Sequence, residues 1–141
     1  MQREIKFRGK RLDNGEWVYG NLLKIDHGTE CACYIIPRIT NGSWSKDRLM
    51  LKFISPCYEV DPETIGEYTG FCDENGKEIC ESDIVELPEF LEQRRKAIVV
   101  WSGGWYWKVG DYRGGNLICA SEIVKIIGNP YDNPELLEAT P

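Results

Sequence analysis

The stretch from residue 69 to residue 85, TGFCDENGKEICESDIV, holds the densest group of side chains that could do chemistry. Two of its five acids, Glu81 and Asp83, are two positions apart, so on a strand they share one face. Two carboxylates that face one cleft from different environments can act as general acid and general base. The pair therefore suggests a hydrolase, although an acid at the start of a strand also commonly accepts hydrogen bonds from loop amides.

The middle of this stretch contains the pair Asn75-Gly76, the strongest short sequence signal for a tight β-turn. A calcium loop is rejected, because aligning Gly76 with the glycine of such a loop puts Phe71 at the first ligand position and Ser82 at the last. Phe71 and Ile79 flank the pair as apolar strand residues. The stretch is therefore predicted to be a hairpin followed by the start of another strand.

Cysteine and histidine do not form the pattern of a metal site or of a nucleophilic triad. Six cysteines occur at positions 31, 33, 57, 72, 80 and 119, and the single histidine is His27. A zinc site usually shows paired C-x-x-C spacings, whereas the tightest spacing here is C-x-C. We predict reduced thiols in the core, with no metal and no cofactor.

An aromatic cluster is the best candidate for a binding surface. On a strand Trp105 and Trp107 share one face and Tyr106 takes the other. Aromatic side chains that remain exposed could bind a proline-rich peptide, a base or a protein, whereas buried ones would complete the core. The candidate binding residues are Trp101, Trp105, Trp107 and Tyr112.

Basic residues suggest nucleic-acid binding as an alternative. The formal charge of −6 opposes non-specific attraction to phosphate, but two local clusters could still form a basic face. The residues of these clusters are Arg3, Lys6, Arg8, Lys10, Arg11, Arg94, Arg95 and Lys96.

The lengths of the apolar segments indicate the cellular compartment of the protein. No segment reaches the roughly 20 consecutive apolar residues of a membrane-spanning helix, and the first residues are not followed by an apolar signal core. We therefore expect a cytosolic protein without membrane contact.

The elements that must position these residues are mainly strands. Strand patterns occur at residues 5–8, 16–23, 34–37, 66–71, 79–87, 97–101, 105–109 and 122–127, with turns at 13–15 and 41–43 and a short helix at 134–137. Pro56 and Pro62 mark a boundary between an N-terminal β segment, residues 1–60, and a second domain, residues 61–141. The five short strands of that domain are typical of a small antiparallel barrel or sandwich.

Five blocks cover nearly the whole chain: REIKFR at 3–8, WVYG at 17–20, IGEYTGF at 65–71, the hairpin stretch at 73–85, and IGNPYDNPELL at 127–137. In sequence and order they resemble the signature blocks of the YopX family of bacteriophage and prophage proteins. The resemblance implies a C-terminal SH3-like small β-barrel. It carries over no catalytic residues and no biochemical activity.

Two positions depart from the family pattern. Ser82 stands where the family has glycine, which predicts that this position does not strictly require a positive φ angle. Cys80 stands where an aromatic residue is usual.

Three functional hypotheses follow. The first is a non-enzymatic binding module that engages a phage or host protein in the host cytoplasm, with a homo-oligomer left open. The second is a nucleic-acid-binding accessory protein that uses the basic N-terminal strand. The third is the hydrolase built on Glu81 and Asp83.

Overall fold

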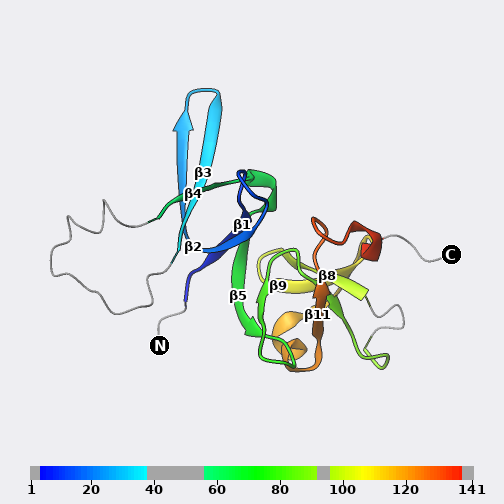
Figure 1. Cartoon of the computed structure of the whole chain (residues 1–141). Helices are drawn as coiled ribbons and strands as arrows, with labels where there is room; N and C mark the ends of the chain where they lie inside the picture. The colour runs from blue at the N-terminus through cyan, green and yellow to red at the C-terminus, as the bar shows by residue number, and fades with distance from the viewer. Residues whose placement is uncertain (1–3, 38–55, 92–95, 138–141) are drawn as a thin grey trace, which may run out of the picture. The chain divides into compact units, whose positions relative to one another are not determined.

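A computed structural model describes residues 4–37, 56–91 and 96–137 of the chain. The fold is mainly β and contains two compact units, Ile5–Glu67 and Met1–Glu4 with Tyr68–Pro141 (Figure 1). Within the described ranges, no helix has the length and apolar character needed to cross a membrane. The turn predicted at 41–43 and the basic residues Arg3, Arg94 and Arg95 lie outside the described residues.

The unit Ile5–Glu67 is an antiparallel sheet in the order β4-β3-β2-β1. Its strands are β1 (Phe7–Lys10), β2 (Trp17–His27), β3 (Glu30–Pro37) and β4 (Tyr58–Val60), followed by the 3-10 turn η1 (Pro62–Thr64). The predicted first hairpin is confirmed, because β1 pairs with β2 across the turn that contains Gly15, whose φ is +72°. Val18, Cys33, Ile35 and Val60 form the core of this unit.

The strand β5 (Gly66–Cys72) pairs with two strands through different residues. Its first residues pair with β1, through Glu67 opposite Phe7. Its later residues pair with β6 (Glu78–Cys80), through Tyr68 opposite Cys80 and Cys72 opposite Glu78.

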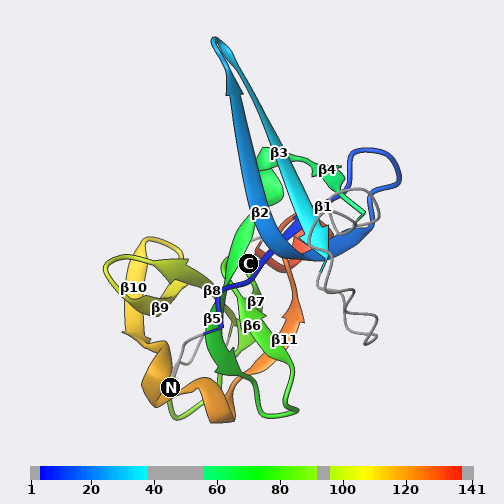
Figure 2. The ribbon, with the colours of Figure 1, turned by 90° about the vertical axis from the view of Figure 1, so that its left-hand side faces the viewer.

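The unit that contains Tyr68–Pro141 has a five-stranded antiparallel sheet in the order β10-β9-β8-β7-β11 (Figure 2). Its strands are β7 (Ile84–Glu86), β8 (Lys96–Trp101), β9 (Trp105–Val109), β10 (Tyr112–Asn116) and β11 (Lys125–Gly128). Among the described residues β10 and β11 remain at the edges of an open sheet, so the closed barrel expected from the sequence is not confirmed.

Three 3-10 turns accompany this sheet. They are η2 (Leu117–Cys119), η3 (Ser121–Ile123) and η4 (Pro134–Leu137). The strand predicted at 122–127 therefore begins later, at Lys125, because 3-10 turns occupy the preceding residues. The short helix expected at the C-terminus is present only as the single 3-10 turn η4.

The core of this unit places an indole ring directly against glycine. The ring of Trp107 lies where a Cβ atom would stand on Gly114, since an ideal Cβ there would be 1.8 Å from Cζ3 of Trp107. A Cβ on Gly115 would be 2.9 Å from Nε1 of the same ring. The two glycines of β10 therefore create the space that lets Trp107 be buried.

We expect Gly114→Ala to lower the free energy of unfolding by about 2 to 3 kcal/mol, because either the ring or β10 must move. Gly104→Ala is the matched control, since its Cβ would meet only the Tyr106 ring, at 3.3 Å, and should cost less than about 1 kcal/mol. Urea unfolding followed by tryptophan fluorescence measures both. Equal losses in the two variants would contradict the packing of Trp107 on Gly114.

Candidate functional site

The four candidate aromatic residues lie on one face of the sheet. Trp101 is directly opposite Trp105 across β8 and β9, and Tyr112 is directly opposite Val109 across β9 and β10. Since Trp105, Trp107 and Val109 alternate along β9, all of these side chains project to the same side.

Burial divides the four residues into two pairs. Trp105 and Trp107 are only 7% and 6% exposed and belong to the hydrophobic core, whereas Trp101 and Tyr112 are 54% and 56% exposed. The indole rings of Trp101 and Trp105 meet edge to face, with centroids 5.0 Å apart. The structure therefore places the middle pair in the core and leaves the outer pair at the surface.

The opposite face of the same sheet carries a cation–π pair that the sequence did not indicate. The guanidinium carbon of Arg113 lies 4.4 Å from the centroid of the half-buried Tyr106 ring. Arg113 and Lys108 are opposite one another in the register of β9 and β10. β9 and β10 form a hairpin with the two-residue turn Gly110-Asp111, and its register brings Arg113 to Tyr106. This contact was not predicted from the sequence because β10 was not identified as a strand.

Two basic residues of the N-terminal strand, Arg8 and Lys10, lie close to one aromatic ring, that of Trp17. The guanidinium carbon of Arg8 lies 4.8 Å from the Trp17 ring centroid, and Nζ of Lys10 lies 5.7 Å from the same centroid. Arg8 is buried, whereas Lys6 and Lys10 are half-buried. A phosphate would have to compete with these contacts, so nucleic-acid binding stays a prediction without structural support.

Arg11 is held by an aromatic ring and a carboxylate. Its guanidinium carbon lies 3.9 Å from the Tyr58 ring centroid, and Nε donates to Oδ1 of Asp13 at 2.9 Å. The hydrogen bond to Asp13 raises the pKa of Arg11 and lowers the pKa of the Asp13 carboxyl. Because Arg11 and Asp13 interact in solvent, this ion pair contributes little to stability. Lys96, the described member of the second basic cluster, is exposed at the start of β8.

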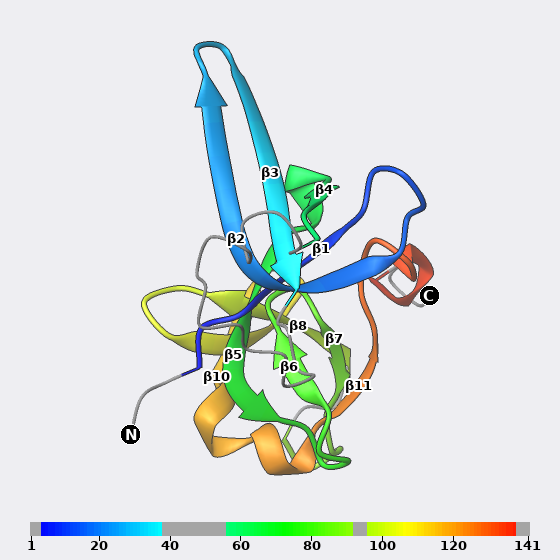
Figure 3. The same cartoon turned by 60° about the vertical axis from the view of Figure 1, so that its left-hand side comes forward.

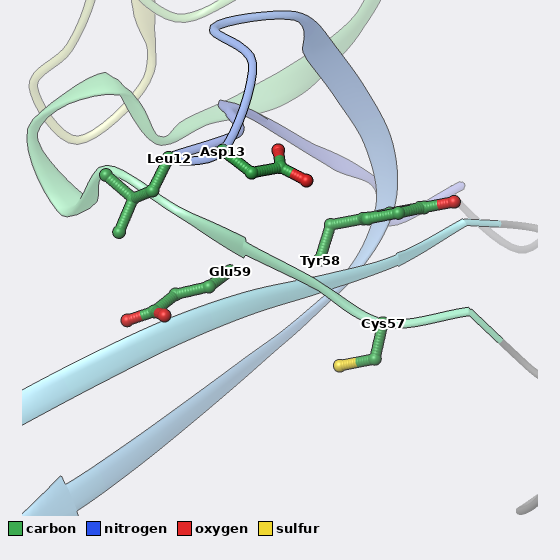
Figure 4. Close-up of a pocket in the computed structure, with 5 residues that line it drawn as sticks. All are labelled: Leu12, Asp13, Cys57, Tyr58 and Glu59. Carbon is green, nitrogen blue, oxygen red and sulfur yellow. The ribbon is translucent and has the colours of Figure 1, made fainter.

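A shallow pocket of about 310 Å³ lies beside this ion pair. Leu12, Asp13, Cys57, Tyr58 and Glu59 line it (Figure 4). The amide of Leu12 donates to the carbonyl of Glu59 at 3.0 Å, which joins segments about 45 residues apart in the sequence. Its two carboxylates, thiol and phenol favour a small hydrogen-bond donor or cation, and the described residues contain no group of three side chains able to hold a metal ion.

The predicted catalytic pair lies at a turn between two strands. Asp83 is 2% exposed, and its Oδ2 accepts a hydrogen bond of 2.7 Å from the amide of Cys80. Val99 on β8 donates its amide to the carbonyl of Asp83, at 2.9 Å. Glu81 is half-buried in the turn itself. This geometry gives Asp83 a structural role, so the hydrolase stays a prediction that nothing in the geometry favours.

Ser82 overturns the conclusion drawn from its departure from the family pattern. Its φ angle is +72°, and it is the only non-glycine residue with a positive φ in the described part of the chain. The amide of Ser82 donates to the carbonyl of Val99 at 2.9 Å, and Asp83 N donates to Cys80 O at 3.1 Å. The turn therefore requires a positive φ whichever residue occupies it, and the strand predicted over 79–87 is divided into β6 and β7.

The predicted Asn75-Gly76 hairpin is confirmed, and one carboxylate organises it. Oδ1 of Asp73 accepts hydrogen bonds from the amides of Asn75 and Lys77, both at 2.9 Å, and Gly76 has a φ of +79°. Oδ2 of Asp73 accepts from the amide of Ile126 on β11, at 3.0 Å. Burial alone would raise the pKa of Asp73, but these three amides outweigh it and hold the pKa below its ordinary value.

The cysteines are only partly as predicted. The thiols of five cysteines are free of disulfide bonds: Cys31, Cys33, Cys57, Cys72 and Cys80. Burial is confirmed for Cys33 and Cys80 but was wrong for Cys31, Cys57 and Cys72, which are exposed. Partial desolvation of the exposed Cys31 thiol, followed by hydrogen bonds with Asp26 and Cys33, raises its pKa, so the chain does not activate it as a nucleophile.

We expect Asp73→Asn to lower the free energy of unfolding at pH 7 by about 1 to 3 kcal/mol, because one carboxamide oxygen cannot serve three amides and the NH₂ group faces a donor. The folded pKa of Asp73 is depressed, so its stabilisation is present above the ordinary value of 3.8 and is lost as pH falls through the folded value. Urea unfolding from pH 7 to about pH 3 should show the two proteins converging in acid. A constant difference would contradict this role.

We expect Ser82→Gly to raise the free energy of unfolding by about 0.5 to 1 kcal/mol, since glycine adopts a positive φ without steric cost. Ser82→Val is the opposing control and should lose about 1 to 2 kcal/mol, because a β-branched residue is strained there. Thermal and urea unfolding measure both. If glycine and valine acted in the same direction, backbone strain at residue 82 would not be the cause.

The chain is similar to known proteins in sequence and in structure. The YopX protein family matches residues 6–138. Among solved structures, the crystal structure of protein EF1440 from Enterococcus faecalis aligns with 97% of this chain and 100% of that chain, with a TM-score of 0.57 and 25% sequence identity. A search of the curated proteins found no match. Because the family match covers nearly the whole chain, the protein belongs to the YopX family.

Proposed function

We propose that the protein is a non-enzymatic binding module of bacteriophage or prophage origin that engages a phage or host protein in the host cytoplasm. The observation that carries the proposal is the exposure of Trp101 and Tyr112, 54% and 56%, on a sheet face whose other aromatic side chains are buried. Exposed tryptophan and tyrosine are typical anchors of protein interfaces, because they bury a large area and lose little conformational entropy.

The spacing of the two residues suits an extended segment of a partner. Trp105 and Val109, the cross-strand neighbours of Trp101 and Tyr112, are four positions apart on β9, which is about 13 Å along a strand. Trp101 and Tyr112 lie on the strands on either side of β9, about 10 Å apart across the sheet, so their backbones are about 16 Å apart on a diagonal. An extended polyproline-type segment advances about 3 Å per residue, so about five residues span this distance. Tyr112 also lies on β10, an edge strand among the described residues, where a partner strand can add by main-chain hydrogen bonds.

Strand order supports an SH3-like assignment within this proposal. Four consecutive strands, β7 to β10, form a meander, the 3-10 turns η2 and η3 follow, and β11 returns to pair with β7. We regard this sheet as an open version of the SH3-like arrangement and assign it to a domain of residues 61–141 that follows an N-terminal segment of residues 1–60. Domains of the SH3 class bind extended peptides on aromatic surfaces, in agreement with the proposed partner.

The test compares proteins retained from a bacterial host lysate by three immobilised forms of the full chain. We expect the Trp101→Ala/Tyr112→Ala double variant to retain its specific partner at least about tenfold less than the wild type, because loss of an aromatic anchor typically costs 2 kcal/mol or more. Quantitative mass spectrometry of the retained proteins measures the ratio.

Phe90→Ala is the matched control, because Phe90 is 80% exposed in the same unit and lies outside the proposed surface. The control should retain the partner as the wild type does. A partner retained equally by all three forms would contradict the role of Trp101 and Tyr112. Absence of any specific partner would contradict the binding module itself.

A further inference from the structure

The strands β2 and β3 form a long ribbon that only partly belongs to the sheet. β1 pairs with β2 only from Trp17 to Gly20, and β4 pairs with β3 only from Cys33 to Ile35. Beyond these points β2 and β3 continue as a two-stranded hairpin to the loop Gly28-Thr29 (Figure 3). In the described ranges, β2 thus has no strand neighbour along the edge Asn21–His27 other than β3 on its opposite side.

Both faces of this ribbon carry apolar side chains. Leu22 lies opposite the fully buried Ile35 and packs against the core of its unit. The other face carries the alternate residues Tyr19, Leu23, Ile25, Ala32, Tyr34 and Ile36. Tyr19 and Leu23 are 46% and 43% exposed. An isolated two-stranded hairpin is marginally stable in water, and an unpaired apolar edge is a template for another strand.

The backbone groups at this edge follow from the hairpin loop. With a two-residue loop, the flanking residues His27 and Glu30 are a hydrogen-bonded pair of the antiparallel ladder. Every second residue of β2 back from His27 therefore directs its amide and carbonyl to β3. The intervening residues, Leu22, Lys24 and Asp26, direct theirs to the open edge.

We propose that a second copy of this chain pairs with this edge, β2 against β2 in antiparallel register, with Ile25 at the two-fold axis. In that register Lys24 of each copy lies opposite Asp26 of the other. Both residues are exposed, and both present their backbone groups to the edge. The surface is self-complementary in hydrogen bonding and in charge, as an isologous interface requires.

Charge also excludes the neighbouring registers. A shift that centres the axis on Lys24 places the two lysines opposite one another, and a shift that centres it on Asp26 does the same for the two aspartates. Like charges directly opposite in a ladder are destabilising. At the axis itself, Ile25 meets Ile25, and Ala32 lies beside it on β3 of each copy. This interface shares no residue with the surface formed by Trp101 and Tyr112, and the proposal does not depend on that surface.

The first test is the molar mass of the full chain in solution, by sedimentation velocity over a range of concentrations. We expect a species of twice the 16.2 kDa of one chain. Asp26→Lys should weaken association at least about tenfold, because each interface then contains two lysine–lysine pairs. The double exchange Lys24→Asp/Asp26→Lys restores opposite charges and should restore the dimer, which separates register from any change in folding.

A cross-link tests the axis directly. In the proposed register Ile25→Cys places two thiols opposite one another in a non-hydrogen-bonded pair, where Cα atoms lie about 4.5 Å apart and a disulfide can form. Leu23→Cys is the matched control, because its neighbour across the axis is His27. Mild oxidation followed by peptide mass spectrometry should find the 25–25 link in the first variant and no 23–23 link in the second.

Two outcomes would overturn the proposal. One is a wild-type chain that stays monomeric up to its solubility limit. The other is a dimer that Asp26→Lys does not weaken, or whose cross-links lie elsewhere.

Discussion

Three backbone amides converge on the carboxylate of Asp73, and two distant parts of one unit are joined there. Asn75 and Lys77 belong to the hairpin between β5 and β6, whereas Ile126 belongs to β11, about 50 residues later. A second hydrogen bond, from the amide of Glu74 to the carbonyl of Val124, reinforces the same junction. Because a buried carboxylate is favourable only when its oxygens are satisfied, hairpin and edge strand stabilise each other, and the position of β11 beside β7 depends on the junction.

The sequence predicted the features whose cause is local. The turns at Asn75-Gly76 and at residues 13–15 depend on a few adjacent residues, so their composition was sufficient. Ser82 was misjudged because residues 80–83 were predicted to be part of one strand, whereas they form a turn closed by the hydrogen bond from Asp83 N to Cys80 O and held against Val99 on another strand. The space that Gly114 leaves for Trp107 depends on the β9–β10 hairpin, which was missed because β10 was not predicted as a strand.

For the candidate site, the sequence predicted which aromatic side chains share a face but not which of them are buried. Alternation along a strand correctly places Trp105 and Trp107 on one face, but it does not say which part of that face is covered. Leu117 and Val124, from η2 and from the chain just before β11, belong to the same buried cluster as Trp105 and Trp107. Because these residues come from later in the chain than β9, only the structure separates the buried pair from the exposed Trp101 and Tyr112. The pocket beside Arg11 was not predicted either, because the two segments that line it are distant in the sequence.

Two of the sheet edges that are open among the described residues, those of β10 and of β2, carry charges that suit them to different partners. Within β10 the only charged residue is Arg113, so two copies of this edge would bring together no pair of opposite charges. The edge of β2 carries Lys24 and Asp26 two positions apart, the spacing that an antiparallel two-fold converts into reciprocal opposite-charge pairs. Self-association therefore favours β2, whereas β10, with Tyr112 beside its single cation, favours a different chain. We propose that charge placement along an edge, rather than its apolar content, selects β2 for a second copy and β10 for a different partner.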